Sequence, residues 1–292
     1  MATAIPGIED RARHGIGLIL LAWFAFALVD TGAKWVAVLA YPAAQIAFFR
    51  YIGHFVVSTA LILRNPEDLR LPPYFRLVLL RGFLLVCATL SNFWIVRELP
   101  LTITSAIMFS TPVIVCFLSV TVLKERVGLW RWFAILLGFI GVLIVIRPFG
   151  EAFHPMMLMA VMNSIFLALY SLITRRLAGE VSTDVMQFWM GLLGTVILLP
   201  PAIWLWKIPE TSTEWTVLIS LGFLAWAGHQ WLTTAHRFAT ANTLMPFTYS
   251  FLLYLIVLSF VIFGHVPSVW TLLGAFVIMM SGLIIWYREG RA

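Results

Sequence analysis

The fold class of this 292-residue chain is decided by residues 81–148, which read RGFLLVCATLSNFWIVRELPLTITSAIMFSTPVIVCFLSVTVLKERVGLWRWFAILLGFIGVLIVIRP. Long apolar runs in this stretch are separated only by short polar segments around Arg97 and Lys124. An apolar helix needs about 20 residues to cross a hydrocarbon core roughly 30 Å thick. The stretch holds the end of one such run and two complete ones, so it predicts transmembrane α-helices.

The rest of the chain continues this pattern. Hydrophobic residues make up 62% of the chain and charged residues 11%, whereas a soluble domain carries roughly 25% charged residues. The composition therefore excludes most soluble globular classes and predicts an all-α integral membrane protein. We expect ten membrane-spanning stretches, at residues 15–37, 42–63, 75–99, 101–123, 130–148, 156–177, 185–206, 213–238, 239–263 and 269–288.

Lysine and arginine are distributed unevenly between alternate connections. One set of connections holds thirteen of them: Arg11, Arg13, Arg64, Arg70, Arg76, Lys124, Arg126, Arg131, Arg175, Arg176, Arg237, Arg288 and Arg291. The other set holds four: Lys34, Arg97, Arg147 and Lys207. Because cytoplasmic loops retain positive charge, we expect both termini in the cytoplasm, an N-in/C-in topology. The net charge of +6 is then explained by loop residues, and no nucleic-acid partner is expected.

The chain also matches itself at an offset of about 140 residues. Examples of the matched pairs are Gly82 with Gly222, Arg97 with Arg237, and Trp130 with Trp270. A duplicated unit of five spans has an odd number of crossings, so its two copies insert with opposite orientations. We therefore predict two inverted five-helix units, residues 15–148 and 156–288. Such repeats are typical of secondary transporters that bind substrate near the midplane; a duplicated scaffold without a pore is the alternative.

Four ionisable residues fall inside the first two predicted spans. Asp30 and Lys34 are four residues apart and share a helix face, as do Arg50 and His54. We expect Asp30 to bridge Lys34 and Arg50. The bridge is either a structural salt bridge, or an external gate or a site for an anionic or dipolar group of the substrate. His54 belongs to a residue type that titrates near neutral pH. With Asp30 it is a candidate for proton coupling, and a hydrogen-bonded interior histidine is the alternative.

A second polar set lies deeper in the predicted spans. We expect its members to line a substrate cavity, or alternatively to hydrogen-bond between helices as they do in many membrane bundles. The set comprises Asn92, Trp94, Asn163, Tyr170, His229, Gln230 and Tyr249. Prolines at positions 112 and 246 predict interruptions of the fourth and ninth spans, and interrupted helices occur where backbone lines a cavity.

Motifs for enzymatic chemistry are missing from the sequence. It contains no GxxxxGK[ST] nucleotide loop, no HExxH zinc motif and no GxSxG elbow. Cys87 and Cys116 both lie in apolar runs without metal-ligand spacing. We therefore expect no catalytic residues, no metal and no cofactor, with an intramembrane enzyme using Asp30 and His54 as a remote alternative.

At this point the sequence resembles a known family. Residues 81–148 are similar to the first EamA repeat of the drug/metabolite transporter superfamily, with a proline in the fourth span, a Lys-Glu pair at its cytoplasmic end and a glycine-rich fifth span. Residues 239–286, ATANTLMPFTYSFLLYLIVLSFVIFGHVPSVWTLLGAFVIMMSGLIIW, match the corresponding layout in the second half. His265 stands where many members carry an acidic residue, which corresponds to Glu125 in the first half.

The resemblance implies a ten-helix carrier of the cell inner membrane. Its partners would be the lipid bilayer and a small-molecule substrate, and it would work as a monomer or homodimer. Members move amino acids, nucleotide sugars, vitamins, S-adenosylmethionine and drugs. PFTY at 246–249 and QIAFFRYIGHF at 45–55 look most like members that take up riboflavin or S-adenosylmethionine. The aromatic-rich interior favours riboflavin, and export of an aromatic amino acid or metabolite is a further alternative.

Overall fold

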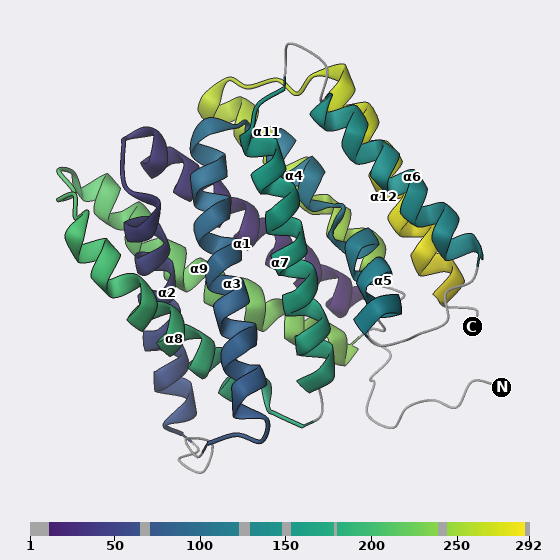
Figure 1. Ribbon diagram of the computed structural model, residues 1–292. Coiled ribbons are helices and arrows are strands. Elements are labelled where there is room, and N and C mark those ends of the chain that lie inside the picture. Colours follow the sequence, from purple (N-terminus) through teal and green to yellow (C-terminus); the bar gives the residue numbers. More distant parts are fainter. Residues whose placement is uncertain are drawn as a thin grey trace.

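The computed structural model describes residues 12–64, 71–122, 129–147, 153–177, 180–238 and 244–289 (Figure 1). All regular elements in these ranges are helices. The first half consists of α1 (Ala12–Val38), α2 (Ala43–Ile62), α3 (Phe75–Glu98), α4 (Leu101–Met108), α5 (Thr111–Val122) and α6 (Leu129–Ile146). The second half consists of α7 (Met156–Leu177), α8 (Thr183–Trp204), α9 (Ser212–Phe238), η2 (Met245–Tyr249), α11 (Ser250–Phe263) and α12 (Val269–Glu289). The predicted all-helical fold is confirmed.

The predicted interruptions fall in corresponding spans of the two halves. The fourth span is divided into α4 and α5 by a turn at Phe109 and Ser110, directly before Pro112. The ninth span has the short 3₁₀ helix η2, which contains Pro246, directly ahead of α11. Proline lacks the amide hydrogen that continues a helix, which accounts for both positions. Lys124 and Glu125 lie outside the described residues, as does the start of the predicted ninth span.

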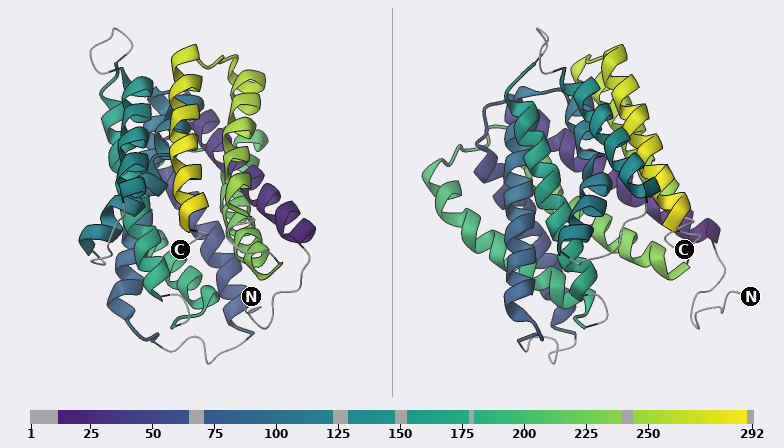
Figure 2. Two further views of the ribbon diagram at one scale, coloured as in Figure 1. Left: turned by 90° about the vertical axis from the view of Figure 1, so that its right-hand side faces the viewer. Right: turned by 45° about the vertical axis from the view of Figure 1, so that its right-hand side comes forward.

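Helix packing follows an approximate twofold relationship between the halves. Each span of the first half corresponds to the span five places later, so α1 corresponds to α7 and α3 to α9. Accordingly α1 packs on α9, and α3 packs on α7. Two further large contacts join corresponding helices directly, α2 with α8 and α6 with α12, and α2 also packs on α9. The helices α6 and α12 lie side by side in Figures 1 and 2.

The α6–α12 contact shows that the two halves are inverted. Residue 138 of α6 faces Ser281 of α12, whereas Val145, further along α6, faces Gly274, nearer the start of α12. The two helices therefore run antiparallel. Gly141 and Gly274 let the backbones approach closely, as small residues commonly do between membrane helices.

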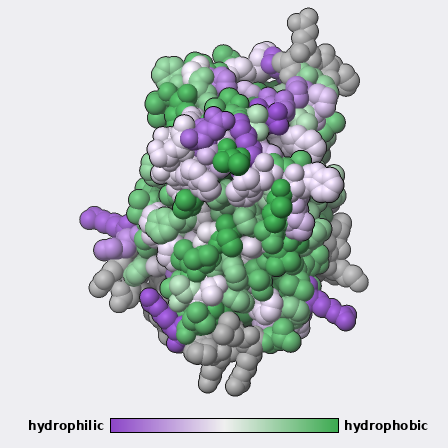
Figure 3. All heavy atoms as spheres, turned by 90° about the vertical axis from the view of Figure 1, so that its left-hand side faces the viewer, coloured by the Kyte–Doolittle hydropathy of each residue, from purple (hydrophilic) through white to green (hydrophobic). Residues whose placement is uncertain are grey.

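The outer surface carries many large hydrophobic side chains. Leu136, Phe139, Val196, Ile203 and Phe260 are each more than half exposed. Figure 3 shows one face on which hydrophobic residues form a broad band, with hydrophilic residues gathered across its upper part and at its lower margin. By length and composition, five of the described helices, namely α1, α2, α3, α7 and α8, are long and apolar enough to cross a membrane. An apolar surface of this extent is explained by contact with lipid.

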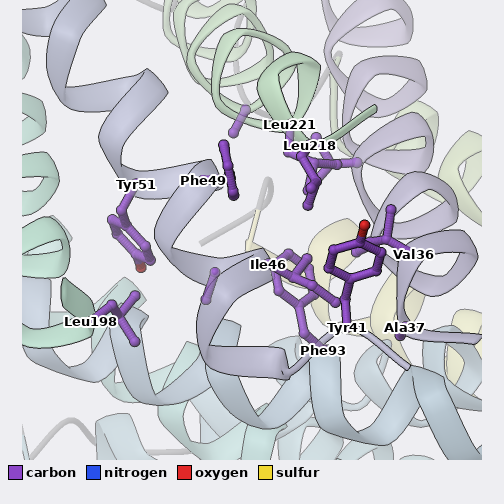
Figure 4. Close-up of a cluster of buried hydrophobic side chains, with 14 of the residues drawn as sticks. Val36, Ala37, Tyr41, Ile46, Phe49, Tyr51, Phe93, Leu198, Leu218 and Leu221 are labelled. Atoms are coloured by element: carbon purple, nitrogen blue, oxygen red, sulfur yellow. The ribbon is translucent and has the colours of Figure 1, made fainter. Parts of the chain in front are cut away.

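The largest buried cluster joins helices of both halves. It includes Tyr41, Ile46, Phe93, Leu198 and Leu218, from α1–α2, α2, α3, α8 and α9 (Figure 4). The cluster holds the two halves together beside the cavity described next.

Candidate substrate cavity

A cavity of about 410 Å³ lies between helices of both halves. Its lining comes from α1, α2, α3, α4, α5, α7, α9, η2, α11 and the Phe109 turn. Six of the residues singled out from the sequence line it, namely Asp30, Arg50, Asn92, Asn163, Tyr170 and His229. The interior polar residues of distant spans thus converge on one space.

A carboxylate and a guanidinium group face this space from neighbouring helices. The Asn92 amide donates a hydrogen bond to Asp30 Oδ1 at 3.1 Å. Arg50 Nη1 donates to the Thr89 hydroxyl at 2.5 Å, and the guanidinium lies 5.4 Å from the centre of the Tyr51 ring. Each charge is thus oriented by a neutral side chain of α3.

A second guanidinium lies behind the cavity wall. Arg81 is 5% exposed, and its Nη2 donates to the Tyr170 hydroxyl at 2.5 Å while its Nε donates to Thr174 at 2.7 Å. The guanidinium also lies 4.4 Å from the centre of the Tyr170 ring. Arg81 therefore fixes the Tyr170 side chain that faces the cavity and adds a buried positive charge close to it.

Aromatic side chains form much of the remaining wall. Trp23 contacts Phe26 and Phe251 with ring centroids 5.6 and 5.4 Å apart, and Phe109 lies 6.4 Å from Phe251. Phe93 completes the aromatic lining. Such walls provide large apolar contact area and suit a flat ring system.

Among the residues that the structure describes, four buried polar atoms on cavity-lining side chains have no hydrogen-bond partner in the protein. They are Trp23 Nε1, Asn92 Oδ1, Asn163 Oδ1 and His229 Nε2. The Asn163 amide nitrogen is fixed by donation to the Ala88 carbonyl at 2.5 Å and to Ser91 at 2.8 Å. Because an unpaired buried polar atom costs about 1–3 kcal/mol, these atoms are the natural hydrogen-bonding positions for a polar ligand.

The predicted bridge from Asp30 to Lys34 and Arg50 is not formed. All three side chains are described, and no nitrogen–oxygen distance of 4.0 Å or less joins Asp30 to either cation. Lys34 Nζ instead donates at 2.7 Å to the carbonyls of Val96 and Leu99, at the end of α3. The α3 backbone offers Lys34 unsatisfied terminal carbonyls, and this contact outweighs pairing along α1.

The other predicted residues lie outside the cavity lining. Trp94 is 50% exposed on the surface. Tyr249 is buried and donates to the Met279 carbonyl at 3.2 Å. His54 is 2% exposed, and its ring centroid lies 5.9 Å from that of His229. Gln230 follows His229 on α9 but does not line the space.

Several lining residues were not predicted from the sequence. They are mainly apolar or hydroxyl-bearing, and include Trp23, Phe26, Thr89, Phe109 and Phe251. Phe109 had a usable signal, because it lies at the interruption predicted from Pro112. For the others, an aromatic residue in an apolar span gives no indication of whether it faces lipid or an interior space.

The cavity lies within the length of the helices that line it. Its α1 lining runs from Trp23 to Asp30, which lies eight residues before the helix ends, and its α9 lining among the described residues is His229 and Leu232. Beyond the cavity, where α1 ends and α9 begins, polar contacts join the two halves. Gln45 exchanges two hydrogen bonds with the Lys207 backbone at 2.7 and 2.9 Å.

Two further contacts belong to this group. The Tyr41 hydroxyl donates to Glu214 at 2.5 Å, and Lys207 Nζ donates to the Leu39 carbonyl at 2.5 Å. We call the four residues Tyr41, Gln45, Lys207 and Glu214 the inter-half latch. Tyr41 lies between the spanning helices, and its pKa is raised because the phenol is buried and donates to the Glu214 carboxylate.

Comparison with known proteins agrees with this architecture. The EamA-like transporter family model matches the chain twice, over residues 13–147 and 154–287. A riboflavin transporter of Vibrio cholerae is 30% identical over 279 residues, covering 94% of this chain and 93% of the relative. An S-adenosylmethionine uptake transporter of Rickettsia bellii is 27% identical over 278 residues, covering 95% of each chain.

A second riboflavin transporter, from Rhizobium johnstonii, is 26% identical over 292 residues and covers 99% of this chain and 96% of the relative. A solved crystal structure with 19% identity superposes with a TM-score of 0.65, over 97% of this chain and 99% of the other. The fold is thus shared with a known structure, and two family matches cover nearly the whole sequence. With its lipid-facing surface and its aromatic-walled cavity lined by a few polar side chains, this multi-pass protein of the cell inner membrane belongs to the EamA-like transporter family.

Proposed function

We propose that this secondary transporter moves riboflavin, or a closely similar neutral metabolite with a flat ring system. The observation that carries the proposal is the set of unpartnered polar atoms in an aromatic-walled cavity. Stacking against Trp23 and Phe251 would hold the ring, and Asn92, Asn163 and His229 would hydrogen-bond its polar edge. The names of two relatives, both riboflavin transporters, support the same choice.

The charge near the cavity favours riboflavin over S-adenosylmethionine. In the part of the lining that the structure describes, Asp30 supplies the carboxylate and Arg50 the guanidinium, and the Arg81 guanidinium lies directly behind Tyr170. Arginine stays protonated at physiological pH, so positive charge is in excess. S-adenosylmethionine carries a sulfonium and an ammonium group against one carboxylate, and this excess opposes its net positive charge. Riboflavin is neutral and avoids that penalty.

Alternating access is the mechanism that we propose, supported by the inverted halves and by the cavity that lies between them. In this conformation the inter-half latch would close the cavity on the side of Lys207, and rocking of the halves about the α2–α8 and α6–α12 contacts would open it. The two halves would be residues 15–148 and 156–288. The side rich in arginine would face the cytoplasm, with both termini there.

Several narrower properties complete the proposal. The protein would catalyse no chemical reaction, bind no nucleic acid and act as a monomer or homodimer. The polar lining atoms would hydrogen-bond a solute, and the group that holds Asp30 is the neutral amide of Asn92.

Transport in proteoliposomes tests the proposal. Purified protein should mediate saturable movement of labelled riboflavin, which excess unlabelled riboflavin should abolish. Asn163→Leu should reduce riboflavin binding at least about tenfold, because it removes a polar partner from a buried hydrogen-bonding position. Empty liposomes provide the background. Movement of S-adenosylmethionine but not riboflavin would overturn the substrate assignment and leave the transporter assignment intact.

A further inference from the structure

Asp30 and Arg50 are opposite charges that face the same cavity without pairing with each other. Asp30 Oδ1 accepts from Asn92 at 3.1 Å, and Arg50 Nη1 donates to Thr89 at 2.5 Å. No nitrogen–oxygen distance between Asp30 and Arg50 is 4.0 Å or less. A directly paired couple would satisfy each partner locally, whereas this arrangement leaves both charges able to act on a ligand between them.

The surroundings make the effect of each charge strong. Phe26, Phe93 and Phe109 share the lining with Asp30 and Arg50, and apolar walls weaken the screening that water provides. Arg81 is 5% exposed and donates to Tyr170 and Thr174, so its positive charge acts on the cavity from behind the wall. Among the described lining residues, Asp30 is the carboxylate that opposes the two guanidinium groups.

We infer that Asp30 and Arg50 together form a charge filter, which sets the preference of the cavity for neutral ring-bearing ligands over their anionic and cationic counterparts. Asp30 offsets the attraction of the guanidinium groups for a phosphate or carboxylate on the ligand, and Arg50 repels an ammonium or sulfonium. Specificity of this kind comes from placing an unfavourable contact against the wrong ligand. The inference rests on the proposed function, because it concerns ligands of the same cavity.

Removal of the Asp30 carboxylate tests the role of Asp30 in the charge filter. Asp30→Asn keeps the shape of the side chain and leaves Arg50 and Arg81 unopposed. We expect it to improve inhibition by riboflavin 5′-phosphate, relative to inhibition by riboflavin, by about tenfold or more at neutral pH. The measurement is competition against labelled riboflavin in proteoliposomes, together with thermal stabilisation of the detergent-solubilised protein by each compound alone.

Removal of the Arg50 guanidinium tests the role of Arg50 in the charge filter. Arg50→Gln should improve inhibition and thermal stabilisation by S-adenosylmethionine by a similar factor, and should weaken the response to riboflavin 5′-phosphate. This variant also keeps the inference testable if Asp30→Asn does not fold, which size-exclusion chromatography would show. The two substitutions must move the ligand preference in opposite directions, a result that general loosening of the cavity would not produce.

Two controls separate the filter from other effects. Glu98→Gln removes a carboxylate that is 43% exposed and lies beside Arg97 at the end of α3, outside the cavity. Ser105→Ala removes a cavity hydroxyl without changing charge. In both variants, the ratio of the inhibition constants of riboflavin 5′-phosphate and riboflavin should stay within about twofold of the wild-type ratio. Neither substitution changes the charge that faces the ligand.

The outcomes also distinguish the inference from the proposed function. If wild-type protein neither moves nor binds riboflavin, the proposed function fails. A gain of stabilisation by riboflavin 5′-phosphate in Asp30→Asn, or by S-adenosylmethionine in Arg50→Gln, would still support the filter. If neither folded variant shows its gain, or if Glu98→Gln shows the same gain, the charge filter is wrong.

Discussion

At the scale of single residues, the buried cation Lys34 stabilises the end of a neighbouring helix. Lys34 is 3% exposed, donates to the carbonyls of Val96 and Leu99, and lies 5.5 Å from the centre of the Phe263 ring. It therefore links α1 to the ends of α3 and α11. The sequence spacing that places it near Asp30 is real, but the longer side chain reaches the carbonyls instead.

Substitution of Lys34 by methionine keeps the apolar length of the side chain and removes its ammonium group. We expect Lys34→Met to lower the free energy of unfolding by about 2 kcal/mol, because two charge-assisted hydrogen bonds are lost and two carbonyls are left unpaired. A thermal unfolding curve in detergent measures this change. Arg64→Met is the matched control at an exposed cation, and an equal loss in both variants would contradict the role given to Lys34.

Tyr41 is predicted to make the stability of the folded protein depend on pH at alkaline values. Its pKa lies above the ordinary value of 10.0 in the folded protein, so the unfolded chain loses this proton first. The unfolded state then binds fewer protons than the folded state, and stability falls as the pH rises above about 10. Tyr41→Phe should be less stable near neutral pH and should show a smaller decline in unfolding temperature between about pH 9.5 and 11. Identical slopes in the two proteins would contradict this prediction.

At the scale of helices, glycines decide how closely the two halves approach. Gly53 of α2 and Gly222 of α9 face each other, and a Cβ atom on residue 222 would lie 2.5 Å from the Gly53 Cα. This crossing lies next to His54 and within two turns of His229, which lines the cavity. A change in the α2–α9 distance would therefore alter both packing and the ligand site.

Gly222→Ala is expected to destabilise the protein by about 2 kcal/mol, because the methyl group overpacks a backbone contact. It should also weaken riboflavin binding. Gly17→Ala on α1 is the control, since nothing lies within 4 Å of the added methyl group; this change should be neutral or stabilise by about 0.5–1 kcal/mol. Unfolding temperatures and riboflavin binding of the two variants provide the comparison, and equal behaviour would contradict the close-contact explanation.

The interrupted spans belong to the same scale. Pro112 and Pro246 stop regular hydrogen bonding, and the turn at Phe109 and the 3₁₀ turn with Thr248 both contribute to the cavity. Local sequence was enough to predict these positions because the missing amide hydrogen of proline acts on its own helix. The residues across the cavity from them could not be predicted in the same way.

At the scale of the whole molecule, the inter-half latch is predicted to separate during transport. Cysteines introduced by Gln45→Cys and Lys207→Cys, in a background without Cys87 and Cys116, should be joined by oxidation or by a short thiol cross-linker. The joined protein should lose riboflavin transport and recover it after reduction. Each single-cysteine variant should be unaffected by the same treatment. Full transport with the cross-link in place would show that this side need not open.

The sequence by itself determined the membrane class, the helical fold and the duplication. Hydrophobicity is a property of each segment, so apolar runs of about 20 residues identify spans without knowledge of their neighbours. An odd number of spans in a repeated unit also requires inversion, which the antiparallel α6 and α12 show. Six interior polar residues were found for the same reason, since burial of a polar group in a span is costly and marks an interior face.

Only the tertiary structure decided which of these residues share a space and what each one contacts. Asp30 and Lys34 lie on one face of α1, yet one accepts from Asn92 and the other donates to the end of α3. The spacing of residues along a helix determines which face of that helix each side chain lies on. The residues that the side chain contacts come from other spans, whose rotation and depth depend on the packing of the whole bundle. The aromatic wall, the unpartnered cavity atoms and the latch all depend on that packing, because each is formed by residues far apart in the chain.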